Sequence, residues 1–263
     1  MAVDRIICGD NVLTMATLPE ECVDLVVTSP PYGDMRTYGG HSWDFEAVAA
    51  GLERVLKPGG VIVWVVGDQT KGGSESGTSF RQALHFMDIG LNLHDTMIYK
   101  SRKPPLTHNR YEQCFEYMFV ISKGRPKTFN AIMRKNSGSG TSLQRDGSCA
   151  SGKDGSAVRQ REEVTIVKDE SQKENIWFYN TGGSQSSIDP VAFNHPAIFP
   201  EALAGDHIIS WSNPDDLVLD PFNGSGTTTK MARQLGRKFL GIEINEEYCD
   251  IARKRIAQGL LFS

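Results

Sequence analysis

Hydrophobic residues along the chain recur with two periods, one typical of amphipathic helices and one typical of buried strands. The run 61–66 is almost purely β-branched or aromatic, as expected of a strand buried on both faces. Residues 45–56 have helical spacing and stop at Lys57-Pro58-Gly59-Gly60, a helix-ending signal. The pattern predicts strands at 5–8, 23–27, 61–66, 93–99, 117–121, 217–219 and 238–242. It predicts helices at 11–18, 45–56, 78–87, 203–209, 229–235 and 246–257.

The order of these elements indicates a fold class. Strands alternate with helices up to residue 87, an order that produces parallel strands joined by crossover helices. Two successive strands, 93–99 and 117–121, then predict an antiparallel hairpin. The predicted fold is therefore α/β, a doubly wound and mostly parallel sheet with one hairpin. Open sheets of this kind bind their ligands at the carboxyl ends of the strands.

The periodicity disappears between residues 123 and 188. This stretch is rich in Gly and Ser interleaved with Arg and Lys, and only residues 163–167 and 176–179 suggest short strands. A loop region of this length inside a compact domain is usually functional or partly disordered. We therefore expect residues 1–122 and 189–263 to form one domain and residues 123–188 to form an inserted region.

The net charge of -4 is unevenly distributed along the chain. From Lys100 to Arg161 there are 13 Lys and Arg against 4 Asp and Glu, a balance of +9, so the remainder carries about -13. A basic segment on an acidic body favours one face that binds a polyanion. A solvated basic loop is the alternative.

The remaining composition narrows the choice further. The five cysteines are scattered, odd in number and never spaced Cys-x-x-Cys, so neither a disulfide framework nor a metal site is predicted. We expect most of them to be small buried side chains. No apolar run is long enough to cross a bilayer, and residues 1–10 lack the pattern of a signal peptide. We expect a cytoplasmic protein without a membrane partner.

The segment Thr28-Ser29-Pro30-Pro31-Tyr32 follows the second predicted strand. Prolines fix φ and cannot donate to a sheet ladder, so this segment should lie at the carboxyl edge of the sheet with its carbonyls and the Ser29 hydroxyl held in fixed directions. The ring of Tyr32 adds a flat face beside these acceptors. Such a set suits a planar group that bears an NH2, such as a nucleobase. A Pro-Pro turn with a packing tyrosine is the alternative.

A second loop, residues 220–228, separates the strand 217–219 from a helix and contains Gly224-Ser225-Gly226. Glycines let the backbone approach a ligand, and the helix N-terminus offers unpaired N–H groups. Glu243 ends the next strand, where its carboxylate can accept both hydroxyls of a ribose. Because Thr229 replaces the third glycine of a dinucleotide fingerprint, a nucleoside cofactor without pyrophosphate is favoured. A tight turn and a solvated carboxylate are the alternatives.

Because it has Ser-Pro-Pro-Tyr, then His-Pro-Ala-Ile-Phe-Pro and Asp-Pro-Phe-x-Gly-x-Gly-Thr-Thr, the sequence resembles the DNA amino-methyltransferases that use S-adenosylmethionine. The catalytic loop precedes the cofactor loop, an order similar to that of the permuted beta class. The resemblance extends from Arg5 to about Ile256, outside the insertion. It implies a circularly permuted Rossmann-like fold, S-adenosylmethionine as cofactor and site-specific methylation of double-stranded DNA. It also allows a homodimer, and a cognate restriction endonuclease as a functional rather than physical partner.

The resemblance assigns roles to individual residues. The catalytic loop would comprise Ser29, Pro30, Pro31 and Tyr32. The cofactor would be held by Asp10 at the adenine edge and by Glu243 at the ribose. His195, Phe199 and Pro200 would cover the methionine end and belong to residues 195–200, the lead-in segment. The loop 220–228, the cofactor loop, would contribute Asp220, Pro221, Phe222, Asn223, Gly224, Ser225, Gly226, Thr227 and Thr228. The insertion matches the target-recognition region by position only. DNA contacts are expected from Lys100, Arg102, Lys103, Arg134 and Lys135.

The residue at position 29 bears on the target atom. In the family, serine there goes mostly with cytosine N4 and aspartate mostly with adenine N6. A hydroxyl can accept from the amine and donate to the ring N3 of cytosine, whereas a carboxylate can only accept. Cytosine N4 is therefore the expected target, with adenine N6 and a non-catalytic DNA-binding relic as alternatives. The absence of a Pro-Cys pair argues against cytosine C5 methylation, and the motif order argues against methylation of RNA or of protein glutamine.

Overall fold

The computed structural model describes residues 1–31, 43–100, 111–137, 140, 142–144, 149–151, 157–159, 164–180, 186–187, 189, 192 and 199–258. The chain forms two compact units. The first comprises Met1–Asn130 and Asn175–Ser263, and the second comprises Ala131–Glu174. The second unit lies within the predicted insertion.

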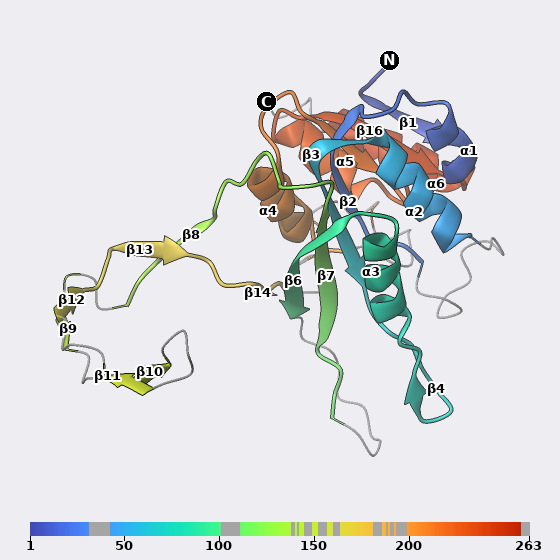
Figure 1. The fold of residues 1–263 in the computed structure, drawn as a ribbon. Helices are drawn as coiled ribbons and strands as arrows, with labels where there is room; N and C mark the ends of the chain where they lie inside the picture. Colours follow the sequence, from blue (N-terminus) through green and yellow to red (C-terminus); the bar gives the residue numbers. More distant parts are fainter. Residues whose placement is uncertain are drawn as a thin grey trace. The chain divides into compact units, whose positions relative to one another are not determined.

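The first unit is built on an eight-stranded sheet (Figure 1). In spatial order its strands are β1 (Arg5–Cys8), β16 (Lys238–Glu243), β15 (Leu217–Asp220), β2 (Val23–Thr28), β3 (Leu56–Val66), β7 (Phe115–Ser122), β6 (Asn92–Lys100) and β14 (Ile176–Phe178). Neighbouring strands are parallel except at β7, which pairs antiparallel with β3 and β6. The prediction of a mostly parallel α/β sheet with an antiparallel hairpin is confirmed.

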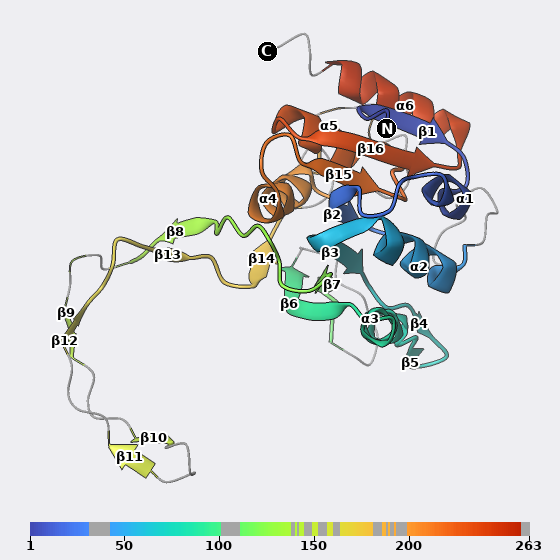
Figure 2. The same ribbon diagram turned by 45° about the horizontal axis from the view of Figure 1, so that its top comes forward.

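Helices cover both faces of this sheet. One set consists of α1 (Asn11–Ala16), α2 (Phe45–Val55) and α3 (Thr78–Asp88), and the other of α4 (Glu201–Trp211), α5 (Thr227–Gln234) and α6 (Glu246–Gln258) (Figure 2). Side-chain caps start the first two helices, because Asp10 accepts from the Leu13 N–H at 2.8 Å and Asp44 accepts from the Ala47 N–H at 3.2 Å. A short hairpin, β4 (Thr70–Lys71) with β5 (Ser74–Glu75), precedes α3.

The sheet order places the last strands of the chain at its centre. β15 lies between β16 and β2, with Val218 opposite Leu25 and Leu219 opposite Val26. Because a methyl donor and its acceptor must meet within a few ångströms, the resemblance predicts that the strands ending at Val27 and Leu219 are neighbours, and this prediction is confirmed. From this pair the chain continues in opposite directions, through α2 to β3 and through α5 to β16. The carboxyl ends of β2 and β15 therefore form a topological switch point, where such sheets bind ligands.

One strand begins earlier than its hydrophobic pattern predicts. β3 starts at Leu56 rather than Val61, directly after α2 ends. Gly59, with φ of 78°, donates its N–H to the Lys123 carbonyl at 2.7 Å and accepts from the Lys127 N–H at 2.9 Å. The helix-ending signal is thus correct, but the glycines continue as an irregular strand because a neighbouring segment supplies their hydrogen bonds.

The second unit consists of three antiparallel pairs that nest in sequence. They are β8 (Met133–Lys135) with β13 (Glu170–Gln172), β9 (Ser142–Gln144) with β12 (Val164–Ile166), and β10 (Cys149–Ser151) with β11 (Ala157–Arg159). Hydrophobic periodicity predicts only β12, which lies within the predicted strand 163–167. Three-residue strands between Gly/Ser-rich segments are too short to show an alternating pattern, so the pairing has no signal in the sequence.

The described cysteines are less buried than the sequence predicts. Of the described cysteines, Cys8 is exposed, Cys22 and Cys114 are half-buried and Cys249 is buried, so the expectation that most are buried is wrong. Cys8 ends β1, while Cys22 and Cys114 directly precede β2 and β7, and strand ends lie nearer to solvent than strand centres. Within the described ranges, no helix is both long and apolar enough to span a membrane.

Candidate functional site

Two hydrogen bonds join the catalytic-loop strand to the cofactor loop. Thr28 Oγ1 donates to Asp220 Oδ1 at 2.7 Å, and Thr228 Oγ1 donates to the Val27 carbonyl at 3.0 Å. Thr28 and Asp220 are 192 residues apart in sequence. All four residues are buried. The start of the Ser29-Pro30 segment is therefore fixed beside both ends of the loop 220–228.

Asp220 is a buried acid at this junction. Burial raises its pKa to about 6, because it outweighs the hydrogen bonds donated by Thr28 Oγ1 and the Phe222 N–H. A folded-state pKa above the ordinary 3.8 means that the folded protein holds this proton more tightly than the unfolded chain does. The stability associated with this proton is thus fully present below about pH 3.8 and is lost as the pH rises through about 6.

Replacing Asp220 by asparagine is expected to remove this pH dependence. The amide keeps an oxygen for Thr28 Oγ1 and the Phe222 N–H but cannot ionise. Between about pH 4 and about pH 8, the native protein should lose up to about 3 kcal/mol that the variant retains. Urea unfolding at the two pH values measures this difference. Equal losses in both proteins would show that the Asp220 carboxyl titrates normally.

The cofactor loop, residues 220–228, is buried throughout, apart from the half-buried Phe222. Gly226 is the N-cap of α5 with φ of 82°, and a Cβ at this position would lie 2.8 Å from the Cβ of Ala252 in α6. The close approach of a ligand to the loop predicts that Gly226→Val would abolish cofactor binding and leave the fold intact, but the contact with Ala252 shows that the second half of this prediction is wrong. Helix packing also requires this glycine.

A second glycine supports the loop from β16. A Cβ at Gly241 would lie 2.5 Å from Asn223 Oδ1, so the Asn223 side chain fits only because residue 241 is glycine. Asn223 also donates its N–H to the Ile242 carbonyl at 2.9 Å and accepts from Thr229 Oγ1 at 2.9 Å. The role of Gly241 cannot be predicted from the sequence, because a glycine in a strand does not reveal which side chain lies over it.

Acidic acceptors end two adjacent strands beside this loop. Cys8 pairs with Glu243 across β1 and β16, so Asp10 and Glu243 emerge at the same edge of the sheet. The half-buried Glu243 accepts from the Gly224 N–H at 2.8 Å and the Asn245 N–H at 2.9 Å. Asn11 Nδ2 donates to the Pro221 carbonyl at 3.2 Å. Carboxylates next to a glycine loop and a helix N-terminus fit a nucleoside, which presents hydroxyl and amino donors.

Phe222 of the loop packs against aromatic rings of the hydrophobic core. The Phe222 ring lies 4.9 Å from the Trp43 ring, centroid to centroid, in an edge-to-face arrangement, and 6.3 Å from Trp64. Trp64 is buried and donates from Nε1 to Gln82 Oε1 at 2.9 Å. The contact between Trp43 and Phe222 has no signal in the sequence, because a single tryptophan ahead of a helix gives no indication of its partner.

The other predicted site residues have varied surroundings. Ser29 and Pro31 are half-buried and Pro30 is buried, while Phe199 is half-buried and Pro200 is the buried N-cap of α4. Lys100 is exposed at the end of β6, and Arg134 and Lys135 are exposed in β8 of the second unit. Four predicted residues lie outside the described ranges: Tyr32, Arg102, Lys103 and His195.

Comparison with known proteins identifies the family to which the chain belongs. The profile of the DNA methylase family matches residues 23–254. The chain belongs to this family. It is 52% identical to the orphan methyltransferase M.BamHII of Bacillus amyloliquefaciens, over 91% of this chain and 90% of that protein. It is 26% identical to the type II methyltransferase M.SmaI of Serratia marcescens, over 96% and 90%. The chain is thus an S-adenosylmethionine-dependent DNA amino-methyltransferase.

Crystal structures of similar proteins share the fold. TTHA0409 of Thermus thermophilus, in complex with S-adenosyl-L-methionine, is 25% identical and superposes with a TM-score of 0.65, covering 99% of this chain and 98% of its own. The PvuII DNA methyltransferase, a cytosine-N4-specific enzyme, is 21% identical with a TM-score of 0.69, covering 97% and 86%. The Rossmann-like methyltransferase fold and the cofactor S-adenosylmethionine predicted from the motifs are confirmed.

Proposed function

We propose that this DNA methyltransferase modifies the exocyclic N4 amine of cytosine at a specific sequence in double-stranded DNA. The observation that carries the proposal is the hydrogen bond from Thr28 Oγ1 to Asp220, because it fixes Ser29 beside the start of the cofactor loop. Methyl transfer requires donor and acceptor within a few ångströms of one another. The serine at position 29 favours cytosine over adenine for the reason given above.

Ser29 and Pro30 activate the exocyclic amine of the target base, which is a weak nucleophile. S-adenosylmethionine supplies a methyl group on a positively charged sulfur. The lone pair of the acceptor amine is delocalised into the base, so the amine attacks poorly. Ser29 Oγ and the Pro30 carbonyl accept its N–H groups and favour a pyramidal nitrogen with an available lone pair. Serine is too weak a base to take the proton at neutral pH, so the proton leaves to solvent after transfer.

We propose a contact for each part of the cofactor from the position of the residues around the cofactor loop. Glu243 accepts the ribose hydroxyls and Asp10 the adenine amine, while Phe222 and the loop glycines lie along the methionine part. The lead-in residues His195, Phe199 and Pro200 complete this end of the site. Because the acceptor amine is inaccessible in a duplex, the target base is flipped out, and we propose that Tyr32 stacks on it.

The target atom has a direct test. Purified protein is incubated with S-adenosylmethionine and duplex DNA of mixed sequence, and the DNA is digested to nucleosides for mass spectrometry. We expect N4-methylcytosine. N6-methyladenine without N4-methylcytosine would show that the inference from Ser29 is wrong and that the protein is an adenine methyltransferase. If neither methylated nucleoside is formed, the proposed function is contradicted altogether.

We further propose that the second unit recognises the DNA sequence. Arg134 and Lys135 are exposed on β8, and Arg134 Nη2 forms an ion pair with Glu174 Oε1 at 2.8 Å. Both partners of this pair are more than half exposed, so the pair contributes little to stability and Arg134 can exchange it for a phosphate. Basic side chains on the strands of such a hairpin can follow a DNA backbone.

Replacing Arg134 and Lys135 together by alanine should weaken DNA binding and flatten its salt dependence. For each phosphate that is no longer bound, the slope of log K against log salt is expected to fall by about 0.9. Fluorescence anisotropy at several salt concentrations measures the slope. Glu174→Gln is the matched control, since it releases Arg134 and should strengthen binding slightly. An unchanged slope in the alanine variant would show that β8 does not contact phosphates.

The relatives suggest the setting in which the proposed activity operates. One is described as an orphan methyltransferase and another as a type II methyltransferase. We propose that the protein methylates cytoplasmic DNA, and that any cognate restriction endonuclease is a functional partner that shares its target sequence without binding to it.

A further inference from the structure

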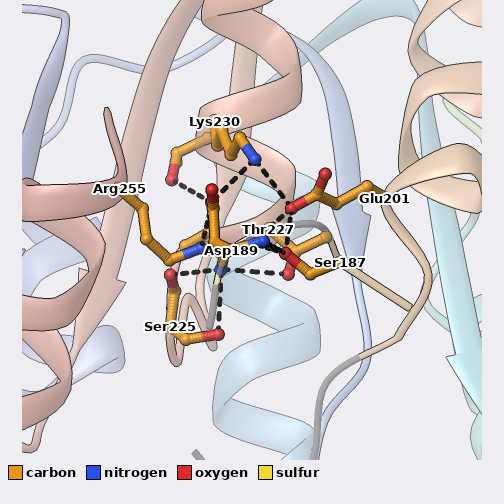
Figure 3. Close-up of polar contacts among 9 residues, drawn as sticks. Ser187, Asp189, Glu201, Ser225, Thr227, Lys230 and Arg255 are labelled. Carbon is orange, nitrogen blue, oxygen red and sulfur yellow. Dashed lines mark hydrogen bonds and ion pairs between the residues drawn. The ribbon is translucent and has the colours of Figure 1, made fainter. Parts of the chain in front are cut away.

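A buried cluster of opposite charges adjoins the cofactor loop (Figure 3). Its cations are Arg255 of α6 and Lys230 of α5, whose side chains are 0% and 5% exposed. Asp189 Oδ2 accepts from Lys230 Nζ at 2.7 Å and from Arg255 Nε at 3.2 Å. Glu201 Oε1 accepts from Lys230 Nζ at 2.9 Å and from Arg255 Nη2 at 2.6 Å. Each cation thus contacts both carboxylates, and the four formal charges cancel.

The two cations favour the ionised form of Asp189. Burial alone raises the pKa of Asp189, but the hydrogen bonds and charges of Lys230 and Arg255 outweigh it and hold the pKa below its ordinary value. Buried ion pairs of this kind often contribute little net stability compared with an apolar substitute, although loss of one partner is costly. A purely structural role therefore does not explain why a guanidinium rather than an apolar side chain occupies this position.

The two cations differ in what else they touch. Arg255 Nη1 donates to the Ser225 carbonyl at 2.6 Å and to Ser225 Oγ at 3.0 Å, and lies 3.4 Å from Thr227 Oγ1. Ser225 is the central residue of Gly-Ser-Gly. Among the hydrogen bonds of the described residues, Lys230 Nζ donates only to the two carboxylates. Arg255 alone of these cations reaches the cofactor loop.

The carboxylates connect this contact to the lead-in segment. Asp189 precedes the lead-in residues His195 to Pro200, and Glu201 follows them directly. Ser187 adds to the first of these flanks, since its hydroxyl donates to Glu201 Oε1 at 2.6 Å and lies 3.4 Å from Arg255 Nη2. One planar guanidinium therefore fixes the cofactor loop against both flanks of the lead-in segment, with several donors in a rigid fork that a lysine cannot reproduce.

We propose that Arg255 is a positioning residue for cofactor binding: its fork fixes Ser225 and Thr227 relative to Asp189 and Glu201, and cofactor affinity depends on that geometry rather than on the charge of the cluster. The inference rests on the proposed cofactor site and extends it to a residue that has no predicted cofactor contact. The guanidinium of Arg255 thereby acts on the ligand through the backbone of the loop.

Two charge-balanced double variants test this. Arg255→Gln with Glu201→Gln leaves the neutral pair Lys230–Asp189 and loses the fork. Lys230→Gln with Glu201→Gln leaves the neutral pair Arg255–Asp189 and keeps it. Isothermal titration calorimetry measures the affinity of each full-length protein for S-adenosylhomocysteine, the product of methyl transfer, and circular dichroism with thermal melting checks folding. The first variant should bind at least about tenfold more weakly than the second, as expected for the loss of a hydrogen bond to a charged group.

If the first double variant does not fold, the single variant Arg255→Lys provides the test. It keeps the cation and loses the fork, so the same weakening of S-adenosylhomocysteine binding is expected. Equal affinities in the two double variants would overturn the proposal and leave the cluster a structural element. Failure of the unmodified protein to bind S-adenosylhomocysteine would overturn the proposed cofactor site together with this inference, so the two failures are distinguishable.

Discussion

Replacing Gly226 by alanine is expected to lower the free energy of unfolding by about 3 kcal/mol. Its φ of 82° costs an L-residue about 1–2 kcal/mol. The added Cβ would also lie 2.8 Å from the Cβ of Ala252 and 3.1 Å from its Cα, so α5 and α6 must move apart, which adds about 1–3 kcal/mol. Denaturant unfolding monitored by circular dichroism measures the loss.

Two controls separate the backbone and packing contributions. Gly236→Ala has a similar φ of 73° and nothing within 4 Å of the added Cβ, so it should show the backbone cost alone. Ala252→Gly removes one of the overlapping atoms, and a double-mutant cycle with Gly226→Ala should give a favourable coupling of about 1 kcal/mol. Additive effects in the cycle would show that the helices do not meet at these residues.

Replacing Glu243 by alanine is expected to weaken binding of S-adenosylhomocysteine by about 100-fold, equivalent to one or two hydrogen bonds to a charged group. The carboxylate is proposed to accept the ribose hydroxyls, and it also holds the Gly224 N–H at 2.8 Å. Its removal thus deletes a ligand contact and releases the loop that forms the rest of the site. Calorimetry on the folded variant measures the effect.

The matched control is Glu247→Ala, which makes the same change of charge on the exposed first turn of α6 and should leave the affinity unchanged. Native affinity in the Glu243 variant would refute the ribose assignment. A similar loss in both variants would indicate that the net charge near the site, rather than one carboxylate, controls binding.

The part of this architecture that sequence can predict is the part governed by local periodicity and by chemistry. Alternating strands and helices predicted the parallel sheet, because buried parallel strands must be apolar on both faces. The contact between β2 and β15 does not follow from periodicity. It was predicted because a methyl donor and its acceptor must meet, and Val218 is indeed opposite Leu25.

The features that escaped prediction depend on tertiary contacts. Arg255 belongs to the run Arg253-Lys254-Arg255, whose composition suggests a solvated helix face. A signal was nevertheless present, since Cys249, Ala252 and Arg255 recur every three residues and all are buried. Spacing could thus have singled out Arg255, but the carboxylates that make its burial tolerable come from distant segments. The packing role of Gly226 escaped for the same reason, because Ala252 is distant in sequence.

The position of β15 and β16 between β1 and β2 has a consequence for the order in which the protein folds. On the ribosome, β1 and β2 are made first, yet in the finished sheet they are separated by two strands that end at Glu243. The nascent chain cannot close the centre of its sheet until β16 has been synthesised. Contacts of such long sequence separation are slow to form. Chains that terminate before β15 therefore lack the edge at which the methyl donor and the target base would meet.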